Sequence, residues 1–215
     1  MKHISILLAL LIALTFLQGN PCLGQSQNTT QNACPDEVDT NGKYVNDSYG
    51  FSLVVPVGLK GTWNSARCVS GPDGCVCMSD HGRIIPLSNG QNDNDHWIEV
   101  YAGFSADMDE PTLQGEADKR VDWIRERSIA ESVSVLERKD IKIGGLDAKR
   151  VVVRYRDRES SRVMVEDFVE ALRGREGQIE YSLYLRSPAD AYAGDKPNFE
   201  RVLSTFALTP CDDCR

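Results

Sequence analysis

The sequence contains little of the chemistry on which most enzymes depend. It has three histidines in 215 residues, and one of them, His3, lies in the N-terminal apolar segment. No Gly-x-Ser-x-Gly nucleophile elbow, phosphate-binding loop or dinucleotide-binding glycine fingerprint occurs. Serine hydrolysis would have to use His81 or His96 as its base, without the turn that usually presents the nucleophile. The sequence therefore names no reaction and no catalytic residue.

Positive charge is also scarce. The chain has 24 Lys and Arg residues against 32 Asp and Glu residues, which gives a formal net charge of −8. A negatively charged protein without a basic cluster repels nucleic-acid phosphates and anionic membrane surfaces. The sequence therefore predicts no nucleic-acid partner, and no motif indicates a cofactor.

Long apolar runs are absent except at the N-terminus. Lys2 precedes the almost purely apolar residues 4–17, and Cys22 to Gly24 places small residues where a signal peptidase requires them. The run is shorter than the roughly 20 residues that cross a bilayer. Residues 1–24 are therefore predicted to be a secretory signal peptide that is cleaved after Gly24. The mature chain would be exported to the periplasm or the medium, with no integral membrane segment.

Six cysteines would remain after this cleavage. An even number of cysteines in an exported chain favours disulfides, because oxidising compartments preserve them. The sequence alone does not choose among the possible pairings. Cys68 is the nearest partner for Cys75 or Cys77, and the two C-terminal cysteines could bond to each other or to Cys34. The predicted disulfide cysteines are Cys34, Cys68, Cys75, Cys77, Cys211 and Cys214.

Two other interpretations of these cysteines are open. Cys211 and Cys214 form a Cys-x-x-Cys motif that could be a redox pair, but the two intervening aspartates disfavour a reactive thiolate. Cys68, Cys75 and Cys77 could bind zinc, although an oxidising compartment makes thiolates scarce. A structural role in disulfides is the prediction for all six.

Local patterns predict the organisation of the remaining chain. A flexible arm rich in Gln, Asn and Thr is expected over residues 25–43, followed by a single domain over 44–215. Residues 57–95 look irregular and form a predicted disulfide-rich loop insertion. A helix is predicted over 109–129 with Asp109 as its N-cap, and a second helix over 196–205. The predicted strands cover residues 51–55, 97–102, 133–143, 148–155, 163–172 and 179–185.

These elements define a fold class. Short turns between consecutive strands require antiparallel pairing, and helices with one apolar face must cover a sheet. The prediction is an α+β fold with a central antiparallel sheet flanked by helices. Residues 179–185 alternate most clearly, which places Tyr184 on the face opposite Tyr181 and Leu183. Tyr184 is therefore predicted to face either a helix or a ligand.

The segment from Asp80 to His96 carries the best candidate chemistry. His81, Asp95 and His96 could form a set of two histidines and one carboxylate for a divalent metal. The Asn- and Asp-rich run over 92–95 is also typical of a solvated turn. A metal-binding protein or metal-dependent hydrolase is thus the alternative function, and no metal is assigned.

The order of five segments resembles the PsbP-like fold, the superfamily of the extrinsic photosystem proteins and many small exported bacterial proteins. The resemblance covers residues 44–208, apart from the cysteine-bearing insertion. It implies a central antiparallel sheet with helices on both sides, an α/β/α sandwich. It also implies a binding or accessory role more than catalysis, and it carries over no catalytic residues. The five segments are the strand Tyr49 to Leu53 that stops at Pro56, the long helix, Ile141 to Ala148, Gln178 to Leu185 and Phe199 to Phe206.

The function predicted from the sequence is that of an exported, non-enzymatic accessory or binding protein. Its partner, a protein or a small molecule, is not identified. Residues 58–95 are the predicted interaction surface, because disulfides would hold this segment rigid and rigid loops form binding sites.

Overall fold

The structure is a computed structural model that describes residues 37–38, 42–64, 68–71, 74–77, 79–86, 96–104, 111–127, 130–174 and 179–210. The predicted signal peptide lies outside these residues, and so do Cys34, Asp95, Cys211 and Cys214. What the sequence predicts for them stays a prediction. Glu37 and Val38, which belong to the predicted arm, form a short strand.

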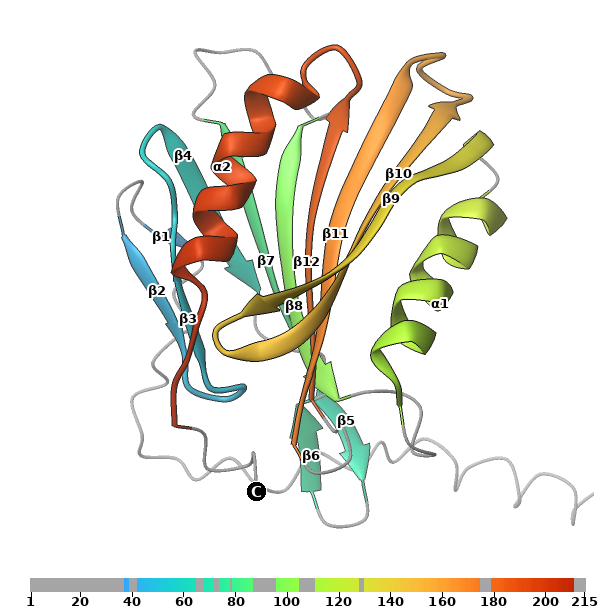
Figure 1. Cartoon of the computed structure of the whole chain (residues 1–215). Helices are drawn as coiled ribbons and strands as arrows, with labels where there is room; N and C mark the ends of the chain where they lie inside the picture. Colours follow the sequence, from blue (N-terminus) through green and yellow to red (C-terminus); the bar gives the residue numbers. More distant parts are fainter. Residues whose placement is uncertain are drawn as a thin grey trace, which may run out of the picture. The chain divides into compact units, whose positions relative to one another are not determined.

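The larger of two compact units contains an eight-stranded antiparallel sheet in the order β1-β4-β7-β8-β12-β11-β10-β9 (Figure 1). Its strands are β1 (Glu37–Val38), β4 (Leu59–Asn64), β7 (Ser79–Pro86), β8 (Trp97–Phe104), β9 (Ala130–Ile143), β10 (Leu146–Asp157), β11 (Val163–Arg173) and β12 (Ile179–Pro188). A small sheet in the order β13-β3-β2 belongs to the same unit. It contains β2 (Lys43–Asn46), β3 (Phe51–Val54) and β13 (Ala207–Leu208).

The helices of the described residues are α1 (Leu113–Glu126) and α2 (Tyr192–Thr205). An antiparallel sheet with helices confirms the predicted α+β class. None of the helices in the described ranges is long and apolar enough to cross a membrane.

The smaller unit contains the hairpin of β5 (Cys68–Gly71) and β6 (Gly74–Cys77). Its register places Cys68 opposite Cys77 and Ser70 opposite Cys75. Directly opposed residues of an antiparallel pair have Cα separations within the range of a disulfide. Of the two partners predicted for Cys68, Cys75 and Cys77, the backbone register is compatible with Cys77.

The prediction of an irregular insertion over residues 57–95 is wrong for β4 and β7, which are strands of the main sheet. Trp63 of β4 is buried and lies opposite Gly82 of β7. A Cβ atom on Gly82 would come within 1.9 Å of the Trp63 ring, so the indole requires a glycine there. Glycine weakens the sequence signal of a strand, and this is why the pattern escaped prediction.

One face of the main sheet is covered by α2 and the small sheet, and it forms the larger apolar core. Ile98 and Val100 of β8 point to this face, as do alternate residues of β12. The two-residue alternation predicted for 179–185 is confirmed, because its odd-numbered residues are all buried here. α2 begins at Tyr192, one turn before the predicted start. The buried residues of β12 and α2 in this core are Ile179, Tyr181, Leu183, Leu185, Phe199, Val202 and Leu203.

The opposite face of the sheet is covered in part by α1, which contacts β9, β10 and β11. The predicted apolar stripe of α1 is confirmed for Ala117, Val121 and Ile124, which are fully buried. The predicted N-cap is wrong, because Thr112 caps α1 and its hydroxyl accepts the N–H of Gly115 at 3.0 Å. A threonine hydroxyl can cap a helix as an aspartate carboxylate can, so residue type alone does not decide between Thr112 and Asp109.

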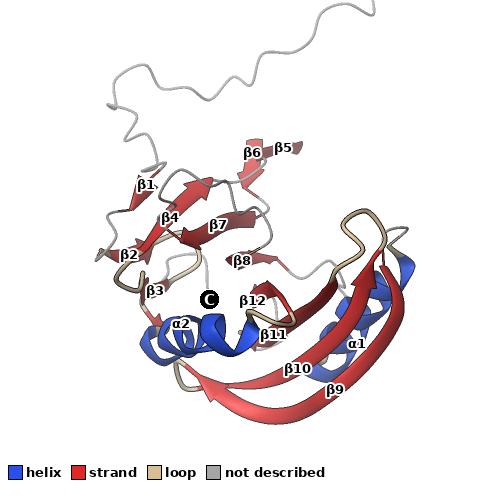
Figure 2. Cartoon of the chain, turned by 90° about the horizontal axis from the view of Figure 1, so that it is seen from above, coloured by secondary structure: helices blue, strands red, loops and turns tan. Residues whose placement is uncertain are grey.

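The long strands β9 and β10 are strongly curved (Figure 2). Their pairing register shifts between Val152 and Val153 and again between Arg154 and Arg156. Such irregularities bend a strand and increase its twist. The curvature lets the β9–β10 hairpin follow the surface of α1.

Candidate functional site

A cavity of about 340 Å³ lies between α1 and the face of the sheet that α1 only partly covers. We call it the α1 cavity. Its floor is contributed by β7, β8, β11 and β12, and its wall by α1. All of these elements belong to the larger unit. Acidic and aromatic side chains make up most of its lining, and their arrangement follows from the strand register.

The central row of the floor runs across four strands. Tyr101 of β8 lies opposite His81 of β7 and also opposite Ser182 of β12. Ser182 in turn lies opposite Glu170 of β11. Residues that pair directly on antiparallel strands point to the same face of the sheet. Four segments that are distant in the sequence thus place a hydroxyl, a phenol, an imidazole and a carboxyl side by side.

The wall of the cavity is one side of α1. Glu116, Lys119, Arg120 and Trp123 lie at helical spacing and line the cavity together. Lys119 donates a hydrogen bond to Glu116 at 3.1 Å. The Arg120 guanidinium lies over the Tyr184 ring, 4.1 Å from its centroid, and over the Trp123 ring at 4.4 Å. The predicted alternative that Tyr184 faces a helix is confirmed, and its side chain also lines the cavity.

Glu170 is the most deeply buried acid of the lining, with 1 % of its surface exposed. Ser182 donates a hydrogen bond to its Oε1 atom at 2.9 Å. Its Oε2 atom has no hydrogen-bond partner among the described residues. Burial, together with the negative charge of Glu180, raises the pKa of Glu170 well above its ordinary value.

Glu180 is the second acid without a cationic partner close by. Burial raises its pKa from 4.5 to about 7, and the negative charge of Glu116 adds to this effect. Lys119 and Arg120 lower it in part. The cavity therefore holds a carboxyl group that changes charge near neutral pH.

The other acids on this face have partners. Glu99 lies 3.7 Å from His81, and Glu116 is paired with Lys119. Within the described part of the chain, Glu170 and Glu180 make no ion pair. The cavity thus has more negative than positive charge at the position of these two side chains.

Glu166 lies beside the cavity and is fully buried. Arg127 donates to its Oε1 atom at 2.8 Å, and the Tyr155 hydroxyl donates to the same atom at 2.9 Å. Arg120 is 3.7 Å from its second oxygen. The charge of Arg120 also acts on Glu170 and Glu180, whose pKa values it lowers in part.

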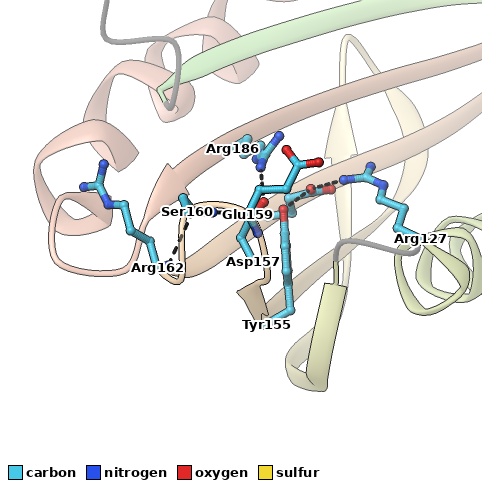
Figure 3. Close-up of polar contacts among 8 residues, drawn as sticks. Arg127, Tyr155, Asp157, Glu159, Ser160, Arg162 and Arg186 are labelled. Atoms are coloured by element: carbon cyan, nitrogen blue, oxygen red, sulfur yellow. Dashed lines mark hydrogen bonds and ion pairs between the residues drawn. The ribbon is translucent and has the colours of Figure 1, made fainter.

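A second polar cluster closes the turn between β10 and β11 (Figure 3). Asp157 accepts the backbone N–H groups of Glu159 and Ser160, at 3.0 and 2.9 Å. Arg186 donates to its other oxygen at 2.9 Å. These bonds lower the pKa of Asp157 against the opposing effect of burial. The cluster has a structural role, since each of these groups is used within the turn.

The two predicted metal-binding histidines lie on opposite faces of the sheet. His81 lies at the α1 cavity, with its ring edge against Tyr101 at 4.9 Å between centroids. His96 contacts Asp195 of α2, with 2.6 Å from Nδ1 to Oδ2. The structure does not bring them together, because β7 and β8 pair with His81 opposite Tyr101, five residues beyond His96. No set of three metal-binding side chains occurs in the described ranges.

Asp195 also accepts a hydrogen bond from Ser187, at 2.5 Å. Serine, histidine and aspartate thus meet at one point on the α2 face. The arrangement differs from a catalytic triad, because Ser187 donates to the carboxylate and not to the imidazole. Ser187 is also fully buried, so its hydroxyl is not presented to a substrate.

Sequence reasoning missed the acids of the cavity. Glu166 and Glu170 lie in β11, whose other residues are mostly apolar, and this strand is buried on both faces. An acid in such a strand must be paired, protonated or functional. That signal was present in the sequence, but the partners of each acid depend on the register of distant strands.

The antiparallel sheet with a helix on each face is the architecture that the resemblance to the PsbP-like fold implies. The crystal structure of LpqN, which is involved in cell envelope biogenesis of Mycobacterium tuberculosis, is similar to it with a TM-score of 0.51 and 12% identity. That likeness covers 78% of this chain and 90% of LpqN, and at this identity it shows the fold alone. No protein-family model and no curated protein sequence matches the chain.

Two further solved structures are similar at lower TM-scores. The solution structure of cyanobacterial PsbP from Synechocystis has a TM-score of 0.48 and 13% identity, over 86% of this chain and 99% of that one. The Ran-binding protein Mog1p of Saccharomyces cerevisiae has a TM-score of 0.45 and 10% identity, over 78% and 95%.

Proposed function

We propose that the protein is an exported, non-enzymatic binding protein and that the α1 cavity holds its ligand. One observation carries this proposal. Glu170 is almost fully buried at the cavity and keeps one carboxyl oxygen without a hydrogen-bond partner in the described structure. Buried polar groups are nearly always satisfied, since an unmet one costs free energy. A ligand that forms a hydrogen bond with this oxygen of Glu170 would satisfy it.

The chemistry of the lining supports binding rather than catalysis. Burial raises the pKa of Tyr101 and of Tyr184, so both phenols stay protonated at neutral pH. They can donate hydrogen bonds, but they are poor bases. Ser182 already donates its hydroxyl proton to Glu170. A volume of about 340 Å³ suits a small molecule better than a protein segment, and this favours the small-molecule alternative for the partner.

We expect small-molecule fragments to bind at the α1 cavity in an NMR screen of the purified protein. Amide shifts should change in β8, β12 and α1. Replacing Lys119 with tryptophan should block the cavity, because Lys119 lies at its edge with half of its side chain exposed. Fragment affinity should then fall at least about tenfold, the equivalent of about 1.4 kcal/mol.

The matched control is Lys142→Trp. Lys142 is a similarly exposed lysine on β9, paired with Asp147. This variant should bind fragments as the wild type does. Fragments that shift only residues outside the cavity, or that bind Lys119→Trp unchanged, would overturn the proposal.

Export is the other part of the proposal, and the N-terminal sequence supports it. The mature protein should begin at Gln25 and contain no free thiol. Mass spectrometry of the secreted or periplasmic protein, with and without a thiol-alkylating reagent, measures both properties. A protein that retains Met1 inside the cell, or that has six reactive thiols, would contradict export.

A further inference from the structure

We infer that the α1 cavity takes a ligand in which a protonated amine or guanidinium group is joined to an aromatic or apolar body. The cation would lie against Glu170 and Glu180, and the body against the cavity's aromatic side chains. This inference names the ligand class of the proposed site and therefore rests on the proposed function.

The balance of charge at the cavity is the first reason. His81 and Lys119 lie beside Glu99 and Glu116, and Arg120 is 3.7 Å from Glu166. Glu170 and Glu180 make no ion pair among the described residues, and the charge of Arg120 offsets theirs only in part. Two neighbouring carboxylates in a desolvated site repel each other. A bound cation removes that repulsion and pairs with both.

The hydrogen-bonding capacity of the lining is the second reason. An ionised carboxylate only accepts hydrogen bonds, and an ammonium group only donates them. Once a bound cation has ionised Glu170, its Oε2 atom is a vacant acceptor deep in the cavity, while its other oxygen is held by Ser182. An anionic ligand could accept from the buried Arg120 Nε and Nη2 atoms, which have no hydrogen-bond partner in the described structure, but it would place its charge beside Glu170 and Glu180. It would also compete with Glu166 for Arg120.

The aromatic side chains are the third reason. Arg120 already lies over the rings of Tyr184 and Trp123. Tyr101 lines the same cavity between His81 and Ser182, and its ring contacts the edge of His81. Aromatic faces attract both apolar groups and cations. An aromatic amine therefore matches the cavity with both of its parts.

A bare divalent metal fits the site less well. No group of three or more histidine, cysteine, aspartate or glutamate side chains with the geometry of a metal site occurs within the described ranges. Glu170 and Glu180 supply carboxylate oxygens alone, while the phenols nearby remain protonated. The geometry thus favours an organic cation that brings its own apolar surface.

The experiment compares two probes of nearly the same shape by isothermal titration at pH 8. Benzylamine carries the cation, and benzyl alcohol replaces it with a neutral hydroxyl. We expect benzylamine to bind the purified protein about 10- to 100-fold more tightly, which is the range for a hydrogen bond to a charged group. Glu180→Gln and Glu170→Gln should each remove most of this preference and leave benzyl alcohol binding nearly unchanged.

Glu180→Gln is the more informative variant, because Glu180 is only partly buried and the substitution keeps its shape. Glu137→Gln is the matched control, since Glu137 is an exposed acid on β9 outside the cavity lining. The Glu137→Gln variant should prefer benzylamine over benzyl alcohol as strongly as the wild type does.

Two results would overturn the inference. Equal affinity for the two probes, with NMR shifts at the cavity, would reject a cationic ligand and leave the proposed binding function standing. Tight binding of zinc or magnesium chloride that depends on Glu170 and Glu180, with no preference for benzylamine, would assign the site to a metal. Probes that produce no shifts at the cavity would reject the proposed function itself.

Discussion

Replacing Asp167 with alanine is expected to destabilise the protein by about 3 to 5 kcal/mol, the usual cost of breaking a buried ion pair. Asp167 accepts two hydrogen bonds from the Arg150 guanidinium, at 2.7 and 2.6 Å. Arg150 is 4 % exposed, so the substitution would leave a buried cation with less of its charge compensated. The loss should appear as a lower midpoint of urea unfolding.

The same carboxylate also fixes the position of α2. The Tyr192 hydroxyl donates to Asp167 at 2.6 Å, and Glu200 of α2 lies 2.7 Å from Arg150. The Arg150–Asp167 pair thus joins β10 to β11, and it contacts α2 through Tyr192 and Glu200. Because α2 covers the larger apolar core, its detachment would expose apolar surface and lower stability further.

Two comparisons make this prediction specific. Asp147→Ala removes a carboxylate that is 78% exposed and paired with Lys142, and it should cost less than about 1 kcal/mol. Replacing Arg150 with methionine and Asp167 with leucine together should recover much of the loss, because neither member of the pair then leaves a buried charge without its partner. A single Asp167→Ala variant within about 1 kcal/mol of the wild type would show that the pair contributes little.

Replacing Glu180 with glutamine should stabilise the protein at pH 8, by up to about 3.5 kcal/mol. The pKa of Glu180 is raised in the folded state from 4.5 to about 7. Each unit of pKa difference corresponds to about 1.4 kcal/mol. The group faces Glu116, Lys119 and Arg120 of α1 and Glu170 of β11, and the two cations reduce the effect without cancelling it.

The sign of this effect follows from proton binding. Between about pH 4.5 and 7 the folded state holds a proton on Glu180 that the unfolded state has lost. Stability from this group therefore falls as the pH rises through that window, and it is unchanged below pH 4.5. Acids with lowered pKa values, such as Asp157 and Glu137, have the opposite effect. They stabilise the folded state increasingly as the pH rises, and they do so at lower pH than Glu180.

Urea unfolding at pH 5 and pH 8 measures this difference. The wild type should lose stability relative to Glu180→Gln between these pH values, while Glu137→Gln should follow the wild type. If the free energies of wild type and Glu180→Gln differ equally at both pH values, Glu180 titrates normally and the cavity is more solvated than its burial indicates.

Elements whose pattern is local could be predicted from the sequence. The stripe of Ala117, Val121 and Ile124 identified α1, and the alternation over 179–185 identified β12, because both patterns repeat within a few residues. β4 and β7 were missed, since Gly61 and Gly82 stand where strand residues would normally give the signal. Gly82 makes sense only once Trp63 of the neighbouring strand β4 is placed against it, and Gly61 lies beside the same indole within β4.

The candidate site could be predicted only in part. The alternation of β12 was sufficient to single out Tyr184, but not to identify what it faces. Glu170 meets Ser182 only through the pairing of β11 with β12, and Arg120 reaches Tyr184 only after α1 has packed on the sheet. The predicted pairing of His81 with His96 failed for the same reason, because proximity in the sequence says nothing about which sheet face each residue occupies.

The most direct test of the α1 cavity as a site for a cationic ligand is a carboxyl carbon NMR titration of the glutamates, with and without benzylamine. In the free protein we expect Glu180 to titrate near pH 7 and Glu170 above its ordinary range. Benzylamine should lower the pKa of both and leave that of Glu137 unchanged, because a bound cation favours the ionised carboxylates. If the pKa values of Glu170 and Glu180 lie near 4.5 and do not change with benzylamine, the two carboxyl groups are not desolvated in the cavity. The proposed class of ligand would then be contradicted as well.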